Sequence, residues 1–220
     1  MFRTILIGFV LSAGSVLAAS EQDPTMLELS HIVRALTEEQ REEIFSESTP
    51  EEKEAMAVLE LDWKDTGKYQ LPDSKSILSI PEGYGLVLGK AAKKYVSFLK
   101  GPVDRELQAV AVNLTTDEEV RFFYHEGGYV SLDDFDTLDS DSLLDEISDL
   151  TEKANIERRK NGVSELHIVG WLQEPTLDKT SSTLYYATEV IEDGAEKHFA
   201  NSIAIRFGRK GYEHLMWIGK

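Results

Sequence analysis

The chain has 220 residues, of which 41% are hydrophobic, and it carries 23 lysines and arginines against 40 aspartates and glutamates, a net charge of -17. Nucleic acids and anionic membrane surfaces are bound by clusters of cations, so this balance argues against both as partners. The sequence contains no cysteine, so the hydrophobic core has to stabilise the fold without disulfides. Length and composition favour a globular chain that buries a sizeable core.

The first twenty residues have the pattern of a secretory signal peptide. Arg3 is followed by an uncharged apolar stretch and then by small residues. Val16-Leu17-Ala18 provides a small-x-small cleavage site, so the sequence predicts a signal peptide over residues 1–18 and a mature chain that begins near Ala19. The alternative is an uncleaved anchor, since the run from Ile5 to Leu11 is apolar enough to enter a bilayer. The mature protein is expected to be periplasmic or secreted, with membrane association left open.

Residues 19–61 are predicted to form an acidic helical region. Two segments in it, Thr37-Glu38-Glu39-Gln40 and Thr49-Pro50-Glu51-Glu52, fit the capping box that begins a helix. Proline at the first helical position costs no hydrogen bond, which supports a helix start at Pro50. The helical period is lost after Asp62, so residues 62–220 are predicted to form a second, compact domain.

The first half of this second domain is expected to combine short strands with one helix. Apolar runs bounded by turn residues predict strands at 76–80 and 85–88, and a hairpin of 107–114 with 120–124. Between them, residues 90–100 have apolar side chains at helical spacing, and Gly101-Pro102 ends that pattern.

The segment from Asp141 to Asn161 has the clearest helical pattern. Acidic residues occupy its first turns, basic residues its last turn, and Gly162 follows as a stop. One stripe is apolar and consists of Leu143, Leu144, Ile147, Leu150 and Ala154. The pattern predicts the main core helix of the domain.

Four strand-like runs follow, at 166–172, 183–191, 200–207 and 212–218. The breaks between the later runs are of the hairpin type, which favours an antiparallel meander. Residues 166–172 are nearly continuously apolar, which is typical of a central strand covered on both faces. Helices that cover a largely antiparallel sheet give an α+β fold, and this is the predicted fold class.

Several motifs recur in a fixed order between Trp63 and the end of the chain. They are Leu78-x-Ile80-Pro81-x-Gly83-Tyr84, Tyr124 to Val130, Asp133-Asp134, Leu143-Leu144, Asn155 with Arg158-Arg159 and Gly162, Gly170-Trp171 with Pro175 and Asp178, Leu184 to Ala187, and Asn201 to Arg206 with Gly208 to Gly211. As an ordered set they resemble the uncharacterised bacterial membrane-anchored proteins of domain-of-unknown-function family 2167.

The resemblance implies an exported, envelope-facing domain without an established chemistry. It also implies hydrophobic C-terminal helices as an anchor, whereas this sequence stops at Lys220, so we expect the anchor to be lacking here. A second departure is Thr176-Leu177-Asp178, where an aromatic residue usually precedes the aspartate.

No common catalytic motif is present in the sequence. The serine elbow G-x-S-x-G, the zinc motif H-E-x-x-H and the phosphate loop G-K-[ST] are all missing, and the five histidines are dispersed. We therefore predict no metal and no cofactor, and we regard an enzyme as the less favoured reading. The acidic run 133–141 lacks the glycine and glutamate of a calcium loop and is read as a solvated loop leading into a helix capped by Asp139 or Ser140.

Cations and aromatic side chains provide the candidate binding residues. If the two arginine pairs 158–159 and 206/209 converge, their planar guanidinium groups can hold a carboxylate, a phosphate or an acidic partner segment. The alternative is internal ion pairing, and for the aromatic residues it is burial in the core. The predicted ligand- or partner-binding residues are Tyr129, Asp133, Asp134, Asn155, Arg158, Arg159, Trp171, Asp178, Arg206 and Arg209.

Two functions of different classes are compatible with these observations. The first is a periplasmic binding, interaction or sensing module whose partner is an envelope protein or a small ligand. The second is a hydrolase that acts on an envelope polymer with aspartate or glutamate carboxylates. A purely structural role is a third reading.

Overall fold

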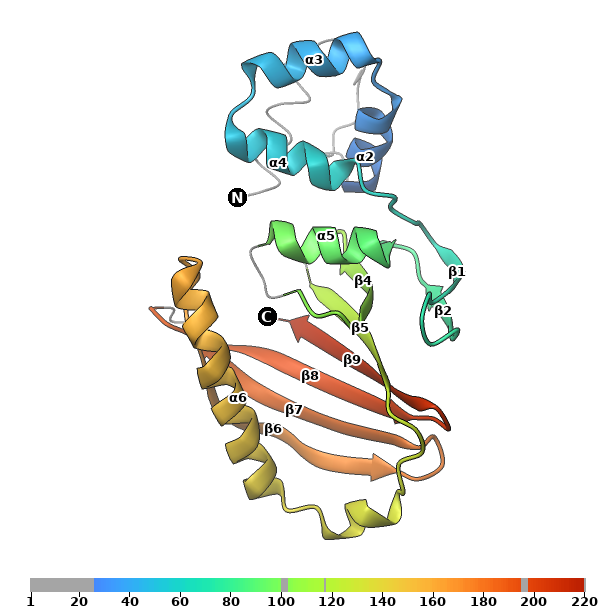
Figure 1. Ribbon diagram of the computed structural model, residues 1–220, viewed down its shortest axis with the longest axis vertical. Helices are drawn as coiled ribbons and strands as arrows, with labels where there is room; N and C mark the ends of the chain where they lie inside the picture. The colour runs from blue at the N-terminus through green and yellow to red at the C-terminus, as the bar shows by residue number, and fades with distance from the viewer. Residues whose placement is uncertain (1–25, 100–102, 117, 195–197, 220) are drawn as a thin grey trace.

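The fold is α+β, as the sequence predicts, and a seven-stranded antiparallel sheet forms its centre (Figure 1). The computed structural model describes residues 26–99, 103–116, 118–194 and 198–219. The signal peptide, its cleavage site and the alternative anchor fall within residues 1–25 and lie outside the described residues.

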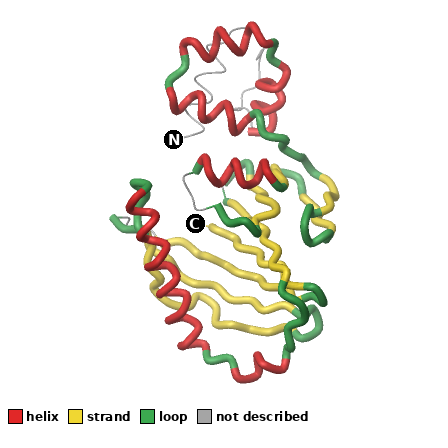
Figure 2. Tube along the Cα trace, in the orientation of Figure 1, coloured by secondary structure: helices red, strands yellow, loops and turns green. Residues whose placement is uncertain are grey.

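In the part of the chain that the structure describes, three short helices precede the sheet (Figure 2). They are α2 (Met26–Ala35), α3 (Glu38–Glu47) and α4 (Pro50–Leu59). Both predicted capping boxes are confirmed: the Thr37 and Thr49 hydroxyls accept from the N–H groups of Gln40 and Glu52, whose side chains accept in return. The Ser30 hydroxyl donates to the Leu59 carbonyl at 2.6 Å and ties α2 to the end of α4.

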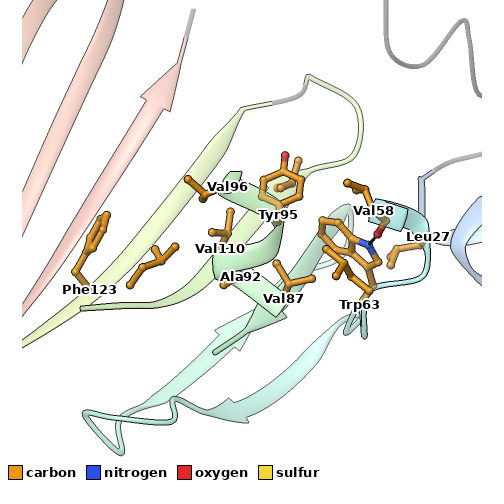
Figure 3. Packing of buried hydrophobic residues seen from close by; sticks show 12 residues of the cluster. Leu27, Val58, Trp63, Val87, Ala92, Tyr95, Val96, Val110 and Phe123 are labelled. Carbon is orange, nitrogen blue, oxygen red and sulfur yellow. Dashed lines mark hydrogen bonds between the residues drawn. The ribbon is translucent and has the colours of Figure 1, made fainter. Parts of the chain in front are cut away.

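The N-terminal helices share a hydrophobic cluster with the following region (Figure 3). Leu27, Val58 and Leu61 belong to the same buried cluster as Trp63 and Tyr95. The Trp63 indole N–H donates to the Val58 carbonyl at 2.9 Å, and its ring meets Tyr95 edge-on at 5.6 Å between centroids. The boundary between residues 61 and 62 stays a prediction, but the two regions pack together.

The large sheet has the strand order β3-β4-β5-β9-β8-β7-β6, and all its pairings are antiparallel. The strands are β3 (Tyr84–Leu88), β4 (Leu107–Asn113), β5 (Glu119–Glu126), β6 (Leu166–Asp178), β7 (Thr183–Glu192), β8 (His198–Phe207) and β9 (Gly211–Gly219). A separate hairpin pairs β1 (Gly67–Gln70) with β2 (Ile77–Ile80). The predicted hairpin of β4 and β5 and the meander β6 to β9 are confirmed. β9 also pairs with β5 and so joins the two halves of the sheet.

Directly opposed residues on neighbouring strands share a face of the sheet. Val110, Arg121, Met216, Ile203 and Tyr186 form one such row, and we call the face that carries it the helix face. Two helices lie on it, α5 (Lys90–Phe98) over β3 and β4 and α6 (Ser140–Lys160) over β6 (Figure 1). The hairpin of β1 and β2 packs on the opposite face, where buried residues include Leu71, Ile80, Leu86, Ala109 and Phe122.

The prediction of a central strand at residues 166–172 is wrong, because β6 is the edge strand of the sheet. Its pairing with β7 is interrupted by register shifts at Ile168/Gly170 and Trp171/Gln173. A bulge adds an unpaired residue and breaks strict alternation, so consecutive apolar residues need not alternate between two buried faces. Val169 and Leu172 are accordingly exposed.

The helix predicted over 141–161 is confirmed as α6, but its role as the main core helix is not. Asn155 is the buried residue of α6, whereas Leu143, Leu144 and Ile147 are half-buried and Leu150 is 57% exposed. The reason is that α6 lies over the edge strand β6, so one side of its apolar stripe has no sheet to pack against.

Candidate functional site

The two arginine pairs predicted to form a binding site lie at opposite ends of the sheet. Arg158 and Arg159 end α6 beside the first residue of β6, whereas Arg206 and Arg209 lie at the turn from β8 to β9 (Figure 1). A ten-residue strand such as β8 spans about 33 Å, which is the separation of those two ends. The structure therefore does not bring the two pairs together.

The arginines at the end of α6 bond to the turn that follows the helix. The Arg158 Nε donates to the Ser164 carbonyl at 2.6 Å, and Arg159 forms an ion pair with Glu165. Burial lowers the pKa of the Arg158 guanidinium, Glu192 partly offsets that effect, and Arg121 adds to it. The internal ion pairing considered from the sequence is seen for Arg159, whereas Arg158 bonds to a backbone carbonyl.

Asn155 connects α6 to the edge strand. Its amide donates to the Leu166 carbonyl at 2.8 Å and accepts from the Leu166 N–H at 2.9 Å. One turn earlier, Glu152 pairs with His167 at 2.9 Å, and this hydrogen bond lowers the pKa of Glu152. These contacts position the helix on the sheet.

The predicted acidic residues lie in turns and loops. Asp178 accepts from the Thr180 N–H and the Ser181 hydroxyl, which lowers its pKa and closes the turn between β6 and β7. Asp133 is exposed at the start of a 3-10 helix, Asp133–Thr137, and the side chain of Asp134 lies outside the described set. Asp139 caps α6, as predicted, and Tyr129 is 76% exposed in the loop after β5.

Trp171 differs from the other predicted residues because its polar atom is buried and has no hydrogen-bond partner among the described residues. Its ring meets Tyr186 edge-on, with 5.6 Å between centroids and 80° between planes. Burial raises the pKa of the Tyr186 phenol to about 12. The indole Nε1 of Trp171 has no hydrogen-bond partner among the described residues.

Two further buried groups without a partner lie on the next two strands, in register with Trp171. Trp171 is directly opposite Thr188 on β7, and Thr188 is directly opposite Asn201 on β8. The Thr188 hydroxyl and the Asn201 Oδ1 are likewise buried without a partner in the described structure, and Thr188 is 1% exposed. We call Trp171, Thr188 and Asn201 the polar row. The row lies on the helix face. Thr188 is two positions from Tyr186 and Asn201 is two positions from Ile203, both of which define that face, and Trp171 pairs with Thr188.

The polar row is unusual because buried polar groups in proteins are almost always paired. Leaving one unpaired costs about 1 to 3 kcal/mol, and here three neighbours on consecutive strands share that condition. Together the unpartnered atoms offer an indole donor, a hydroxyl that can donate and accept, and an amide oxygen that accepts. The arrangement can bind a molecule that supplies matching hydrogen bonds.

Across the sheet, the row of opposed residues continues to Glu119, whose charge is balanced by an arginine. Asn201 is opposite Ile218, and Ile218 is opposite Glu119, which is 8% exposed. Glu119 accepts from the Arg121 Nε at 2.6 Å and forms an ion pair with the same guanidinium. The charge at this end of the row is therefore already paired.

Sequence reasoning identified Trp171 but missed Thr188 and Asn201 as site residues. Asn201 was noted only as part of a family motif, and nothing in the sequence around Thr188 distinguishes it from other strand threonines. The pairing register between three strands creates the row, and that register is a property of the fold.

Two broader searches were negative within the described ranges. They contain no group of three or more histidine, cysteine, aspartate or glutamate side chains placed to hold a metal ion. They also contain no helix of the length and hydrophobicity needed to cross a membrane.

The fold has partial similarity to the solution structure of the cyanobacterial PsbP protein (CyanoP) from Synechocystis sp. PCC 6803. The TM-score is 0.43 at 13% sequence identity, over 70% of this chain and 79% of that chain. No curated protein matches the chain. A family described as "Protein of unknown function (DUF2167)" matches residues 63–220, a range that includes the whole seven-stranded sheet, α5, α6 and the polar row. This chain belongs to that family, DUF2167.

Proposed function

We propose that this protein is an exported binding module of the bacterial envelope and that it binds its ligand or partner at the polar row. One observation carries the proposal: Trp171, Thr188 and Asn201 adjoin one another on three strands, and each has a buried polar atom without a partner in the described residues. Proteins that break the rule of polar pairing tend to do so at functional sites.

Export is supported by the sequence at the N-terminus. Arg3, the apolar stretch after it and the small residues before Ala19 have the order of a secretory signal. The acidic balance of the chain disfavours nucleic acid and anionic lipid surfaces, so a protein or a small molecule of the envelope is the expected partner.

The test uses the full chain with a C-terminal tag in a Gram-negative host. The protein is isolated from separated periplasmic, membrane and cytoplasmic fractions and examined by native mass spectrometry and by crosslinking in intact cells. We expect the protein in an envelope fraction. We also expect a bound species on the wild-type protein that is absent from the Thr188→Val variant. Thr183→Val is the matched control, since that hydroxyl is buried on the same strand but already donates to the Ser181 carbonyl. A cytoplasmic protein, or a bound species retained by Thr188→Val, would contradict the proposal.

A hydrolase is the second candidate, and one pair of carboxyl groups favours it. Burial and a hydrogen bond to Glu106 raise the pKa of Asp104, and the same hydrogen bond lowers the pKa of Glu106. Carboxyl groups with divergent pKa values are a common acid and base arrangement. A hydrogen-bonded pair lies closer than the separation of about 5 Å or more found in glycosidases, so peptide hydrolysis fits better. Cleavage of envelope peptides that Asp104→Asn abolishes would establish this candidate, and no cleavage by the wild-type chain would remove it.

A further inference from the structure

The chemistry of the polar row restricts the ligands that it can accept. None of its three side chains carries a formal charge, and their unpartnered atoms are a donor, a hydroxyl of either role and an acceptor. The matching partner is a molecule with several hydroxyl or amide groups, each able to take either role. This step rests on the proposed binding function.

Among the described residues, the charge that ends the row is already paired. Glu119 forms an ion pair with Arg121. A charged ligand would lose its hydration on entering this region, and the described residues around the row offer it no unpaired counter-ion. An uncharged ligand avoids that cost.

An aromatic corner adjoins the same groups. Trp171 and Tyr186 meet edge-on, and the Trp171 indole N–H lacks a partner among the described residues. Aromatic surface next to hydrogen-bonding groups suits a ring that has C–H groups on its faces and hydroxyl groups around its rim. Sugar rings have this combination.

We expect α6 to control access to the row, because it packs on β6, the strand that carries Trp171. The Asn155 contact with Leu166 provides a fixed point. From the rise per residue of a helix, Leu144 lies about 16 Å from this point along α6, and from the rise of a strand Trp171 lies about 16 Å from it along β6. The N-terminal half of α6 therefore lies level with Trp171. Its apolar residues there are only half-buried, whereas its C-terminal half is bonded to the turn before β6. Lifting the N-terminal half about the Asn155 contact would open the row.

We propose that the polar row binds an uncharged, hydroxyl-rich ligand, a sugar unit of an envelope glycan, beneath the N-terminal half of α6. The ligand hydroxyls would pair with the Trp171 indole, the Thr188 hydroxyl and the Asn201 amide, and the sugar ring would pack on the aromatic corner.

The test follows the indole N–H signals of the full chain by NMR while the trimer of N-acetylglucosamine is added. The chain has three tryptophans, and Trp63 is an internal reference because its indole already donates to Val58. We expect the Trp171 signal to shift, the Trp63 signal to stay, and the amides of residues 140–147 to exchange more slowly when the sugar is bound. Thr188→Val should weaken binding at least about tenfold, with Thr183→Val close to wild type.

The other outcomes separate the ligand class from the proposed function. If the sugar leaves the Trp171 signal unchanged while an N-acetylated, amidated tripeptide shifts it, the sugar assignment is wrong and binding at the row stands. If glucuronate shifts the signal and the neutral trimer does not, the requirement for an uncharged ligand is wrong. If none of the three shifts it and native mass spectrometry finds no bound species, both the ligand class and the binding function fail.

Discussion

The Asn155 side chain forms two hydrogen bonds with the backbone of Leu166, accepting from its N–H at 2.9 Å and donating to its carbonyl at 2.8 Å. A neighbouring strand would satisfy the outward-facing groups of an edge strand in the same way. The amide therefore takes the place of one strand residue at the open edge of β6, and it attaches the helix to the sheet at the point where the chain turns from one to the other.

Replacing Asn155 should destabilise the fold strongly. Asn155→Ala leaves the Leu166 N–H and carbonyl without a partner, and we expect the free energy of unfolding to fall by about 3 kcal/mol. Asn155→Asp should be comparably harmful because a carboxylate can accept from the N–H but repels the carbonyl. Urea denaturation measures the free energy of unfolding of both variants. The control is Asn161→Ala, a substitution at an exposed position. A change in Asn155→Ala no larger than in the control would show that the two bonds contribute little.

Removing the hydroxyl of Thr188 should raise the stability of the fold. Thr188→Val replaces an unpartnered buried hydroxyl by a methyl group of similar size, and we expect the thermal midpoint to rise, with a gain of about 1 kcal/mol. Thr183→Val removes a hydroxyl that donates to Ser181 at 3.1 Å and should lower stability by about 1 kcal/mol. Differential scanning calorimetry of the two variants decides the matter, because a destabilised Thr188→Val would mean that the hydroxyl has a structural partner.

Acid should destabilise the protein through His214. Burial lowers the pKa of His214 from 6.5 to about 4, and its neighbour His125 adds to the effect. The unfolded chain gains a proton near pH 6.5 while the folded protein does not, so this contribution to stability is complete above pH 6.5 and is lost as the pH falls toward 4. The loss is about 3 kcal/mol at most.

The variant His214→Phe isolates this effect from the titration of carboxylates. Phenylalanine keeps a ring beside Phe123, which contacts His214 at 5.2 Å between centroids, and removes the titrating group. Denaturant midpoints measured from pH 7 to pH 4 should therefore fall less steeply in the variant than in the wild type. Parallel curves would show that His214 is protonated normally in the folded protein.

A methyl group at Gly211 should disrupt the junction between β5 and β9. A Cβ atom there would lie 2.0 Å from the His125 carbonyl oxygen, which is part of the backbone and has little freedom to move. We expect Gly211→Ala to lower the free energy of unfolding by about 3 kcal/mol. Gly170→Ala is the control, since a Cβ at Gly170 meets nothing within 4 Å, and its stability should change little. Equal stability of the two variants would contradict the close approach.

Features that depend on a few neighbouring residues were predictable from the sequence. The capping boxes at Thr37 and Thr49, the Asp139 cap and the hairpin of β4 and β5 all follow from side chains within a few positions of one another. Each of these interactions forms inside a single element or a single turn, so the local sequence contains all of its determinants.

Features that depend on distant segments were not predictable. The run 166–172 has the composition of a central strand, and only the final strand order makes β6 an edge. The separation of Arg158 from Arg209 depends on the arrangement of the strands, because α6 ends beside the start of β6 and β8 ends at the opposite end of the sheet. The polar row also depends on strand pairing. Thr188 becomes part of it only because the register places Trp171 of β6 and Asn201 of β8 on either side.

The position of β9 has a consequence for how the chain folds. The strands β3 to β5 and the strands β6 to β8 pair only within their own groups until β9 lies between β5 and β8. Before that step each group presents an unpaired backbone edge, and such edges invite association with other chains. Completing the sheet requires contacts between residues far apart in sequence, which slows folding. We therefore expect insertion of β9 to be the late, rate-limiting event, and an intermediate that waits for it to be the species most prone to aggregate.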